Sequence, residues 1–327
     1  MATSSAARQM PDDEARSEFA REILAGLKAF PKRTSPKYFY DNAGSQLFER
    51  ITEQPEYYPT RTEVALLKEN AREIVELFPP GAALVEFGMG SSTKARILLK
   101  AATSLSAYVP VDISADHLRD EAKLLALDFP HLAILPVAAD FTQSFEIPVS
   151  VRSKARVGFF PGSTIGNFEP QAAILLLQRF ANVLGEGAGL IVGVDLVKDP
   201  KVLDAAYNDA GGVTAAFNLN LLNRINHELG GSFDPRSFEH RAFYNSSRNR
   251  VEMHLASLKR QSARVDGEII DFQTGETIHT ENSYKYSIES FHSLARSAGS
   301  KPLAVWIDPE KYFSIHMLGF ESKARPK

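Results

Sequence analysis

The chain has 327 residues, of which 44% are hydrophobic and 24% are charged. These fractions are close to the averages of globular proteins and leave enough apolar material for a core, which excludes a largely disordered chain. At ~150 residues per domain, the length predicts about two domains. The formal net charge is −3. Because there is no basic excess to bind a phosphate backbone, we expect no nucleic-acid partner.

The chain contains no cysteine. This excludes disulfides, thiolate zinc sites, iron–sulfur clusters and a cysteine nucleophile. No apolar run approaches the ~18 residues that span a bilayer, so we expect no membrane association. The first residues are polar and lack the apolar core of an export signal. We therefore expect a cytoplasmic protein with a loose N-terminal tail at residues 1–16.

A first amphipathic helix is predicted over residues 17–29, and Pro31 and Pro36 then break the chain. Residues 38–58 are dense in aromatic side chains. Thr60 followed by Glu63 has the spacing of a capping box, which predicts that a helix begins there. This helix is expected to bury one face, formed by Val64, Leu67, Ala71, Ile74 and Val75.

From residue 82 onward, short apolar runs alternate with helical segments. Strands are predicted at 82–87, 107–112, 133–137, 156–160 and 189–195, and helices at 92–105, 114–129 and 170–184. Prolines lie inside the second and third of these strands, where they cannot donate to a ladder. The alternation predicts an α/β fold with a parallel sheet.

After Asp195 the alternation stops. The remaining predicted elements are a helical stretch at 196–230, strands at 240–245 and 250–257, a helix at 287–298 and a hairpin of strands 302–307 and 313–320. We interpret this order as an α/β domain that is interrupted by an insertion. The α/β domain would comprise residues 61–195 and 286–327, and the second domain residues 17–60 and 196–285.

The first predicted strand runs into the turn Gly88-Met89-Gly90 and then into a helix. Glycines there let a ligand approach the backbone, and the helix N-terminus offers unpaired N–H groups. Alone the turn is a weak signal, because it also serves as a plain tight connection. Thr93 stands where a dinucleotide fingerprint requires a third glycine. Glu86, two residues before Gly88, is typical of S-adenosylmethionine sites, where an acid lies near the cationic end of the cofactor.

Two acids follow at the ends of the next two strands. Asp112 can accept hydrogen bonds from ribose hydroxyls, or it can cap the next helix. Asp140 with Phe141 can bind an adenine amino group and stack on its ring, or form an ordinary turn. Gly88, Asp112 and Asp140 lie at successive strand ends, where open α/β sheets bind ligands. The set is therefore much more specific than any of its members.

The fourth strand leads into residues 161–168, a loop with two glycines and an asparagine that is either a ligand loop or a plain turn. With this loop, five segments of the chain resemble the histidine-specific Nα-methyltransferases of ergothioneine biosynthesis. They are residues 39–41, 55–63, 86–90 with Lys94, 162–167 and 281–285. The resemblance is ordered and covers about residues 17–325.

The resemblance implies a class I, Rossmann-like domain that binds S-adenosyl-L-methionine, and a second α+β domain that encloses the amino acid. It implies Nα-trimethylation of L-histidine to hercynine, the first step of ergothioneine biosynthesis, with S-adenosyl-L-homocysteine as the other product. The family's cofactor site maps onto Tyr40, Gly88, Lys94, Asp112, Asp140 and Phe141, to which the glycine turn adds Glu86 and Gly90. Met89 departs from the small polar residue expected between the glycines.

The family's histidine site maps onto Tyr57, Asn167, Tyr207, Met253, Glu281 and Ser283. The first three would hold the amino and carboxylate groups, Glu281 and Ser283 would recognise the imidazole, and Met253 would form a pocket wall. A carboxylate beside a hydroxyl suits imidazole recognition. Residues 282–284 differ from some members of the family. Tyr40 and Tyr57, or a water that they hold, are the candidates for positioning or deprotonating the amine.

Each assignment has a structural alternative. Tyr57 and Tyr207 are also typical core tyrosines, Met253 lies on an apolar strand face, Glu281 fits a solvated loop and Lys94 fits a helix surface. The eight histidines show no metal-like spacing along the sequence, so we expect no metal.

Three other functions compete with this interpretation. The nearest is methylation of tryptophan or another aromatic amino acid, but an indole would leave Glu281 poorly paired and needs more room beside Met253. An NAD-dependent oxidoreductase is disfavoured by Thr93 and Glu86. A non-catalytic S-adenosylmethionine-binding partner protein is disfavoured because both sets of site residues are present. We expect a monomer that acts on a small amino acid.

Overall fold

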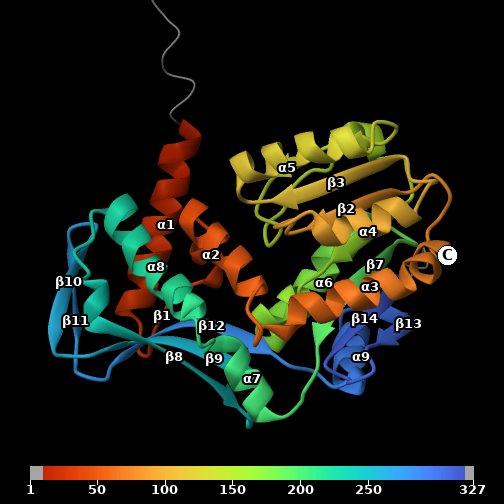
Figure 1. Cartoon of the computed structure of the whole chain (residues 1–327). Coiled ribbons are helices and arrows are strands. Elements are labelled where there is room, and N and C mark those ends of the chain that lie inside the picture. Colours follow the sequence, from red (N-terminus) through yellow and green to blue (C-terminus); the bar gives the residue numbers. More distant parts are fainter. Residues whose placement is uncertain (1–9, 321–327) are drawn as a thin grey trace, which may run out of the picture. The chain divides into compact units, whose positions relative to one another are not determined.

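The computed structural model describes residues 10–320, which divide into two compact units (Figure 1). The larger unit comprises residues 57–199, 246–250 and 283–320, and the smaller unit comprises residues 10–56, 200–245 and 251–282. These boundaries differ from the predicted domain boundaries by a few residues. The turn at 246–250 belongs to the larger unit, although it lies inside the predicted insertion.

The larger unit contains a mixed eight-stranded sheet in the order β13-β14-β7-β6-β2-β3-β4, with β5 also paired to β3. The strands are β2 Ala83–Phe87, β3 Ala107–Asp112, β4 Ala133–Ile134, β5 Val137–Ala138, β6 Arg156–Phe160, β7 Gly189–Asp195, β13 Ser300–Ile307 and β14 Phe313–Phe320. The strands from β2 to β7 are parallel, and β13 and β14 are antiparallel to their neighbours. The expected α/β class is confirmed.

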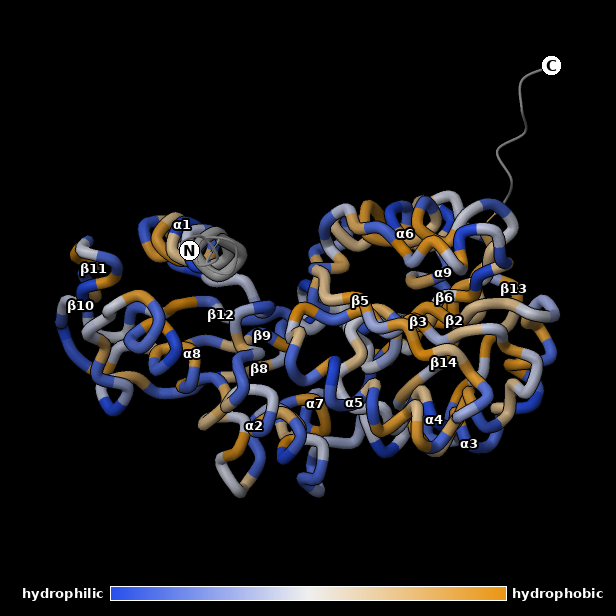
Figure 2. Tube along the Cα trace, turned by 90° about the horizontal axis from the view of Figure 1, so that it is seen from above, coloured by the Kyte–Doolittle hydropathy of each residue, from blue (hydrophilic) through white to orange (hydrophobic). Residues whose placement is uncertain are grey.

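Helices cover both faces of this sheet, and the strands are therefore apolar on both sides. The helices are α3 Tyr58–Glu76, α4 Thr93–Ala101, α5 Ala115–Asp128, α6 Pro170–Leu184 and α9 Ile288–Ser297, with short 3-10 turns η2 Val149–Val151 and η3 Thr164–Asn167. Val85 and Phe87 pack in the core beneath α6 and α9, whereas Leu84 packs in the core beneath α3, α4 and α5. Figure 2 shows the apolar colouring concentrated on β2, β3 and β6.

Most predicted elements of this unit are confirmed, and β3, β6, β7 and α6 have the predicted bounds. The third predicted strand, 133–137, is wrong in detail because it is two short strands, β4 and β5. Pro136 has no N–H to donate to a ladder, so it interrupts the pairing. Leu135 N still donates to Tyr108 O at 2.9 Å, which keeps the segment at the sheet edge.

The predicted capping box is also wrong. The helix begins at Tyr58, with Tyr57 as its N-cap residue and Pro59 in its first turn, so Thr60 already lies inside the helix. Pro59 is well accommodated there because the first helical N–H groups have no partner within the helix. Glu63 is buried rather than folded back on the helix end, and its partners are described below.

The smaller unit has a four-stranded sheet in the order β1-β12-β9-β8 and a separate hairpin of β10 and β11. Its strands are β1 Lys32–Arg33, β8 Phe238–Asn245, β9 Arg250–Ser257, β10 Gln261–Val265, β11 Glu268–Phe272 and β12 Thr277–Tyr284. Its helices are α1 Met10–Lys28, α2 Asn42–Thr52, α7 Pro200–Tyr207 and α8 Val213–Leu229, with 3-10 turns η1 Pro36–Phe39 and η4 Pro235–Ser237. No sequence-based prediction covered β10, β11 and β12.

Two predictions for this unit need correction. The first helix begins at Met10 rather than at residue 17, so only residues 1–9 of the expected tail remain, and they lie outside the described residues. Pro11 is tolerated because it occupies the first helical turn. The helical stretch 196–230 is two helices, because Gly211 and Gly212 separate them and Gly212 adopts a positive φ of 66°. Between residues 10 and 320, no helix is both long and apolar enough to cross a membrane.

Candidate functional site

The carboxyl ends of the parallel strands bring the predicted glycine turn and the first acid together. Gly88 N donates to Val111 O at 2.8 Å, and Gly90 N lies 3.4 Å from Asp112 Oδ2. Gly88 and Gly90 have φ values of 78° and 45°, which favour glycine. A Cβ atom on Gly88 would stand 3.2 Å from the Phe141 ring. The turn therefore needs glycine for its backbone and for the close approach of the aromatic ring.

The two strand-end aspartates hold their own loops. Asp112 Oδ1 accepts the Ser114 N–H at 2.8 Å, one residue before α5 begins, and its Oδ2 faces Gly90 N. Asp140 Oδ1 accepts hydrogen bonds from Thr142 N at 2.8 Å and Thr142 Oγ1 at 2.5 Å. These are short-range turns of the kind that the structural alternative predicted. They also fix the direction of both carboxylates at the ligand-binding edge of the sheet.

Glu86 is fully buried within β2 and lies beside Tyr108 of β3, whose hydroxyl donates to Glu86 Oε2. Its other oxygen, Oε1, is buried and accepts no hydrogen bond from any residue between 10 and 320. Burial raises the pKa of Glu86 to about 8, and the Tyr108 hydrogen bond and the charge of Lys94 only partly offset this effect. A carboxyl group with an unsatisfied buried oxygen at a strand end is a candidate to interact with a cation.

Lys94 is not the surface lysine of the structural alternative. Its Nζ pairs with Glu63 Oε2 at 2.5 Å, and the two side chains are 15% and 1% exposed. Glu63 also accepts the Gly162 N–H, at 3.0 and 2.9 Å to its two oxygens. Gly162 has a φ of 78°. Glu63 therefore ties α3, the start of α4 and the loop after β6 together.

The loop after β6 also approaches the end of β12. A Cβ atom on Gly166 would lie 2.7 Å from Tyr284 O, so only glycine fits this crossing. Asn167 is the last residue of η3 and is half-buried, and Tyr57 is half-buried at the N-cap of α3. Ser283 is buried near the end of β12. The larger unit thus carries three of the six predicted histidine-site residues.

The other predicted residues lie in the smaller unit. Tyr40 follows η1 and makes edge contacts with Phe48 and Phe217, with ring centroids 5.6 and 5.8 Å apart. Tyr207 ends α7, where it is buried, and its carbonyl lies 2.9 Å from His240 Nε2. Met253 is buried in β9, as the structural alternative predicted, and Glu281 is half-buried in β12.

The sequence analysis missed a buried charged group at the end of β7. Asp195 accepts hydrogen bonds from the Tyr58 hydroxyl at 2.8 Å and from Lys285 Nζ at 2.6 Å, and Lys198 also donates to it. Burial disfavours the charged carboxylate, but Lys285 and Lys198 outweigh this effect and lower the pKa of Asp195. Burial lowers the pKa of Lys198 to about 8. The available signal was an acid that ends the fifth predicted strand, at the edge where the other ligand-binding candidates lie.

A metal-like grouping was missed as well. One carboxylate oxygen of Glu252 and one nitrogen each of His254 and His279 lie within 4.8 Å of one another. The sequence spacing of the histidines showed no sign of this grouping, because β9 and β12 are neighbours and bring distant histidines together. The two imidazole rings stack at 4.6 Å with an interplanar angle of 15°. Nearly parallel rings do not direct their lone pairs at a common point, so the group is not a preformed metal site.

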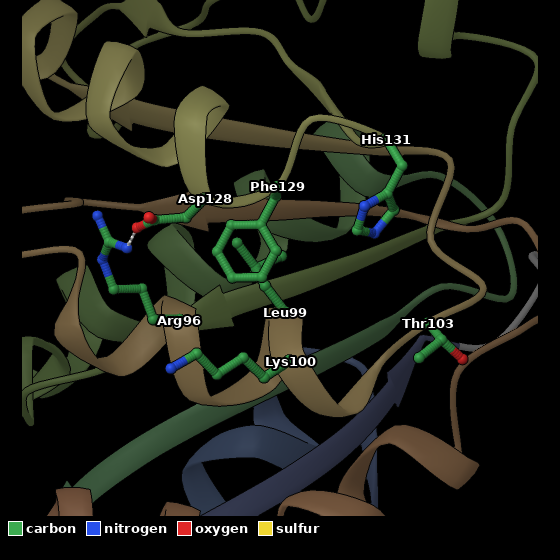
Figure 3. A pocket seen from close by; sticks show the side chains of 7 residues that line it. All are labelled: Arg96, Leu99, Lys100, Thr103, Asp128, Phe129 and His131. Atoms are coloured by element: carbon green, nitrogen blue, oxygen red, sulfur yellow. Dashed lines mark ion pairs between the residues drawn. The ribbon is translucent and has the colours of Figure 1, made fainter.

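A surface cavity of about 410 Å³ lies away from all of these residues (Figure 3). It is lined by Arg96, Leu99, Lys100, Thr103, Asp128, Phe129 and His131, and Arg96 pairs with Asp128. These residues end α4 and α5 and precede β3 and β4, so the cavity lies at the amino ends of the strands. Open α/β sheets bind their ligands at the other edge.

The strand order, the Gly-x-Gly turn after β2 and the acids after β3 and β5 define a class I S-adenosylmethionine-dependent methyltransferase. The model of a family described as histidine-specific, SAM-dependent methyltransferases matches residues 19–320. The chain belongs to this family.

Similar proteins support the same family. The chain is 41% identical to histidine N-alpha-methyltransferase of Mycolicibacterium smegmatis, over 96% of this chain and 99% of that protein. It is 38% identical to histidine N-alpha-methyltransferase of Mycobacterium tuberculosis, over 96% of this chain and 98% of that protein. It is 29% identical to ergothioneine biosynthesis protein 1 of Neurospora crassa, over 88% of this chain but 33% of that protein. The first two similarities run through both units of the structure.

Proposed function

We propose that the protein transfers three methyl groups from S-adenosyl-L-methionine to the α-amino nitrogen of L-histidine. The products are hercynine and S-adenosyl-L-homocysteine, and the reaction is the first step of ergothioneine biosynthesis. The observation that carries the proposal is the family match over residues 19–320, which spans the cofactor-type sheet and the smaller unit alike.

For the cofactor, we assign roles to the residues that gather at the carboxyl ends of β2, β3 and β5. Gly88 and Gly90 let the cofactor approach the backbone, and Asp112 accepts hydrogen bonds from its ribose hydroxyls. Asp140 binds the adenine amino group and Phe141 stacks on the ring. Glu86 faces the cationic end. Tyr40 and Lys94 complete the proposed set, with Lys94 held in place by Glu63 at 2.5 Å.

For the amino acid, the roles follow the hydrogen-bonding capacity of each side chain. Tyr57, Asn167 and Tyr207 hold the amino and carboxylate groups. Glu281 and Ser283 bind the imidazole, because a carboxylate accepts from a ring N–H and a hydroxyl can donate or accept. Met253 forms an apolar wall.

The chemistry is an in-line displacement in which the amine nitrogen attacks the sulfonium-bound methyl carbon. The enzyme has to desolvate a neutral amine and hold it near that carbon. The α-ammonium group must first lose a proton, and the hydroxyls of Tyr40 and Tyr57, or a water that they hold, are our candidates for positioning the amine or accepting this proton. Aromatic faces stabilise the quaternary ammonium that forms as methyl groups accumulate.

Methylation of tryptophan or another aromatic amino acid is the second candidate. The pair of Glu281 and Ser283 argues against it, because an indole offers one ring N–H to Glu281 but no bare ring nitrogen to the Ser283 hydroxyl, which stays unpaired. A pocket built to bind hydrogen-bonding groups strongly rejects analogues that lack them.

Mass spectrometry of the purified protein with S-adenosylmethionine and an equimolar mixture of histidine, tryptophan, phenylalanine and tyrosine tests the proposal. We expect histidine to gain three methyl groups. Glu281→Ala should lower kcat/KM for histidine by roughly 10–100-fold, whereas Glu268→Ala, an exposed carboxylate on β11, should not change it. Trimethylation of tryptophan alone would show that the imidazole assignment is wrong. Binding of S-adenosylmethionine without any methylated product would show that the protein is not a methyltransferase.

We further propose that the active form is a cytoplasmic monomer without a metal. Light scattering should give the mass of one chain, 36.1 kDa. Activity should survive dialysis against EDTA, because methyl transfer from a sulfonium needs no Lewis acid. If EDTA abolished the activity and added zinc restored it, the group of Glu252, His254 and His279 would be the first candidate for a zinc site.

A further inference from the structure

Two buried lysines share the Asp195 carboxylate, although one would balance its charge. The side chains of Asp195, Lys198 and Lys285 are 1%, 4% and 1% exposed. Lys198 bonds Asp195, the Tyr58 hydroxyl at 2.6 Å and Leu196 O at 2.5 Å. Tyr58 adds a neutral donor to the same carboxylate. One of the two ammonium groups is therefore surplus to the pairing of this charge.

A surplus buried ammonium is costly. Moving a charge out of water is repaid only by good geometry and full hydrogen bonding, and apolar residues of similar size often serve stability as well or better. Stability alone thus gives little reason for a second lysine beside Asp195. This prompts the question of what Lys285 does that Lys198 does not.

Of the two lysines, Lys285 is the one that contacts Ser283. Lys285 Nζ lies 2.8 Å from Ser283 Oγ and 2.6 Å from Asp195 Oδ2. No contact joins Lys198 to Ser283 in the hydrogen bonds of the described residues. Asp195 itself is held by its backbone N–H, which donates to Ser163 Oγ at 2.9 Å. Lys285 therefore extends from a fixed anchor to the Ser283 hydroxyl.

This contact determines whether the Ser283 hydroxyl acts as a hydrogen-bond donor or acceptor towards Lys285. An ammonium group has three donors and no acceptor, so Ser283 Oγ must accept from Lys285. The hydroxyl proton is then directed away from Lys285. A hydroxyl that accepts a bond from a cation is polarised and becomes a better donor through its own proton.

We propose that Lys285 is a positioning residue that fixes the Ser283 hydroxyl as the donor to the bare ring nitrogen of a neutral imidazole. This inference rests on the proposed function of Ser283. Glu281, two residues earlier in β12, supplies the acceptor for the ring N–H. One donor and one acceptor match a neutral imidazole, which carries one N–H and one bare nitrogen. An indole has no bare ring nitrogen, so Lys285 contributes to the choice of histidine.

A double-mutant cycle on the full-length protein tests this role. Lys285→Met leaves Asp195 paired with Lys198 and Tyr58, so the fold is expected to persist. We expect KM for histidine to rise roughly 5–10-fold, the loss of one hydrogen bond, while kcat and the Kd for S-adenosylhomocysteine change less than about twofold. In the Ser283→Ala background, the same substitution should have no further effect on KM, because the hydroxyl on which Lys285 acts is gone.

Lys198→Met is the matched control, because it removes the other buried lysine from the same carboxylate without touching Ser283. It should leave KM for histidine unchanged. Equal effects of the two lysine variants, or an additive effect of Lys285→Met and Ser283→Ala, would show that Lys285 is only structural and overturn the inference. Failure of the wild-type protein to methylate histidine would instead refute the proposed function, so the two outcomes are distinguishable.

Discussion

Glu86 occupies a position where burial disfavours the ionised form of its carboxyl group. It is fully buried, and burial raises its pKa to about 8, compared with an ordinary value of 4.5. The folded protein therefore keeps a proton that the unfolded chain has already released. The stabilising contribution is complete below pH 4.5 and is lost as the pH rises through about 8.

Glu86→Gln should remove this pH dependence. We expect the fall in the free energy of unfolding between pH 5 and pH 8 to be smaller in the variant, by on the order of 3 kcal/mol. Urea denaturation at several pH values measures it, with Glu289→Gln, an exposed carboxylate of α9, as the control. Parallel pH profiles for wild type and Glu86→Gln would contradict the raised pKa.

At the residue scale, the sequence predicted where residues lie at the strand ends better than which side chains they contact. The places of Gly88, Asp112 and Asp140 at strand ends were predicted, because they depend on local apolar runs and backbone geometry. The partner of Lys94 was not, because Glu63 was interpreted as a helix cap. Asp195 was seen only as the end of a strand, since one of the two lysines that pair with it lies 90 residues away.

At the scale of elements, apolar periodicity sufficed where a strand or helix is regular. The bounds of β3, β6, β7 and α6 were predicted from runs of apolar residues and from glycines. Errors arose where one residue breaks a ladder or a helix, as Pro136 does between β4 and β5. The sequence analysis missed β12, which pairs with distant segments, and also the hairpin of β10 and β11, although Asp266-Gly267 between two alternating runs is a strong hairpin signal.

The start of α3 allows a direct test of the corrected capping. Glu63→Gln removes the ion pair with the mostly buried Lys94, so we expect a loss of about 2–4 kcal/mol in the free energy of unfolding. Thr60→Ala should change it by less than about 0.5 kcal/mol, because Thr60 lies inside the helix and does not cap it. Chemical denaturation compares the two. A loss near 1 kcal/mol in the free energy of unfolding for Thr60→Ala would show instead that Thr60 caps the helix.

At the scale of the whole molecule, both units are assembled from separate stretches of the chain. An insertion in a methyltransferase sheet could be inferred from the loss of alternation after Asp195. The assignment of residues 246–250 to the larger unit could not, because it depends on contacts such as Lys285 N to Asn249 O at 2.7 Å. The order of the strands in the sheet could not be inferred either, because it is set by pairing between segments that are distant along the chain.

Binding of S-adenosylhomocysteine should stabilise the two units unequally. At a concentration 100 times its Kd, a ligand adds about 2.7 kcal/mol to the free energy of unfolding. We expect hydrogen exchange to slow in β2 and β3, next to Gly88 and Asp112. The hairpin of β10 and β11 carries none of the proposed site residues and should exchange at an unchanged rate. Protection that is strongest in this hairpin would contradict the assigned cofactor site.

The sequence by itself determined the class of fold, the glycine turn and its acids, and the family, through ordered motifs along nearly the whole chain. These features are local, because apolar period, positive φ and motif spacing are properties of neighbouring residues. Only the tertiary structure decided which charges meet across the fold: Glu63 with Lys94, and Asp195 with Lys285. The physical reason is that a buried charge requires a partner, and the fold selects that partner from segments that are distant along the chain.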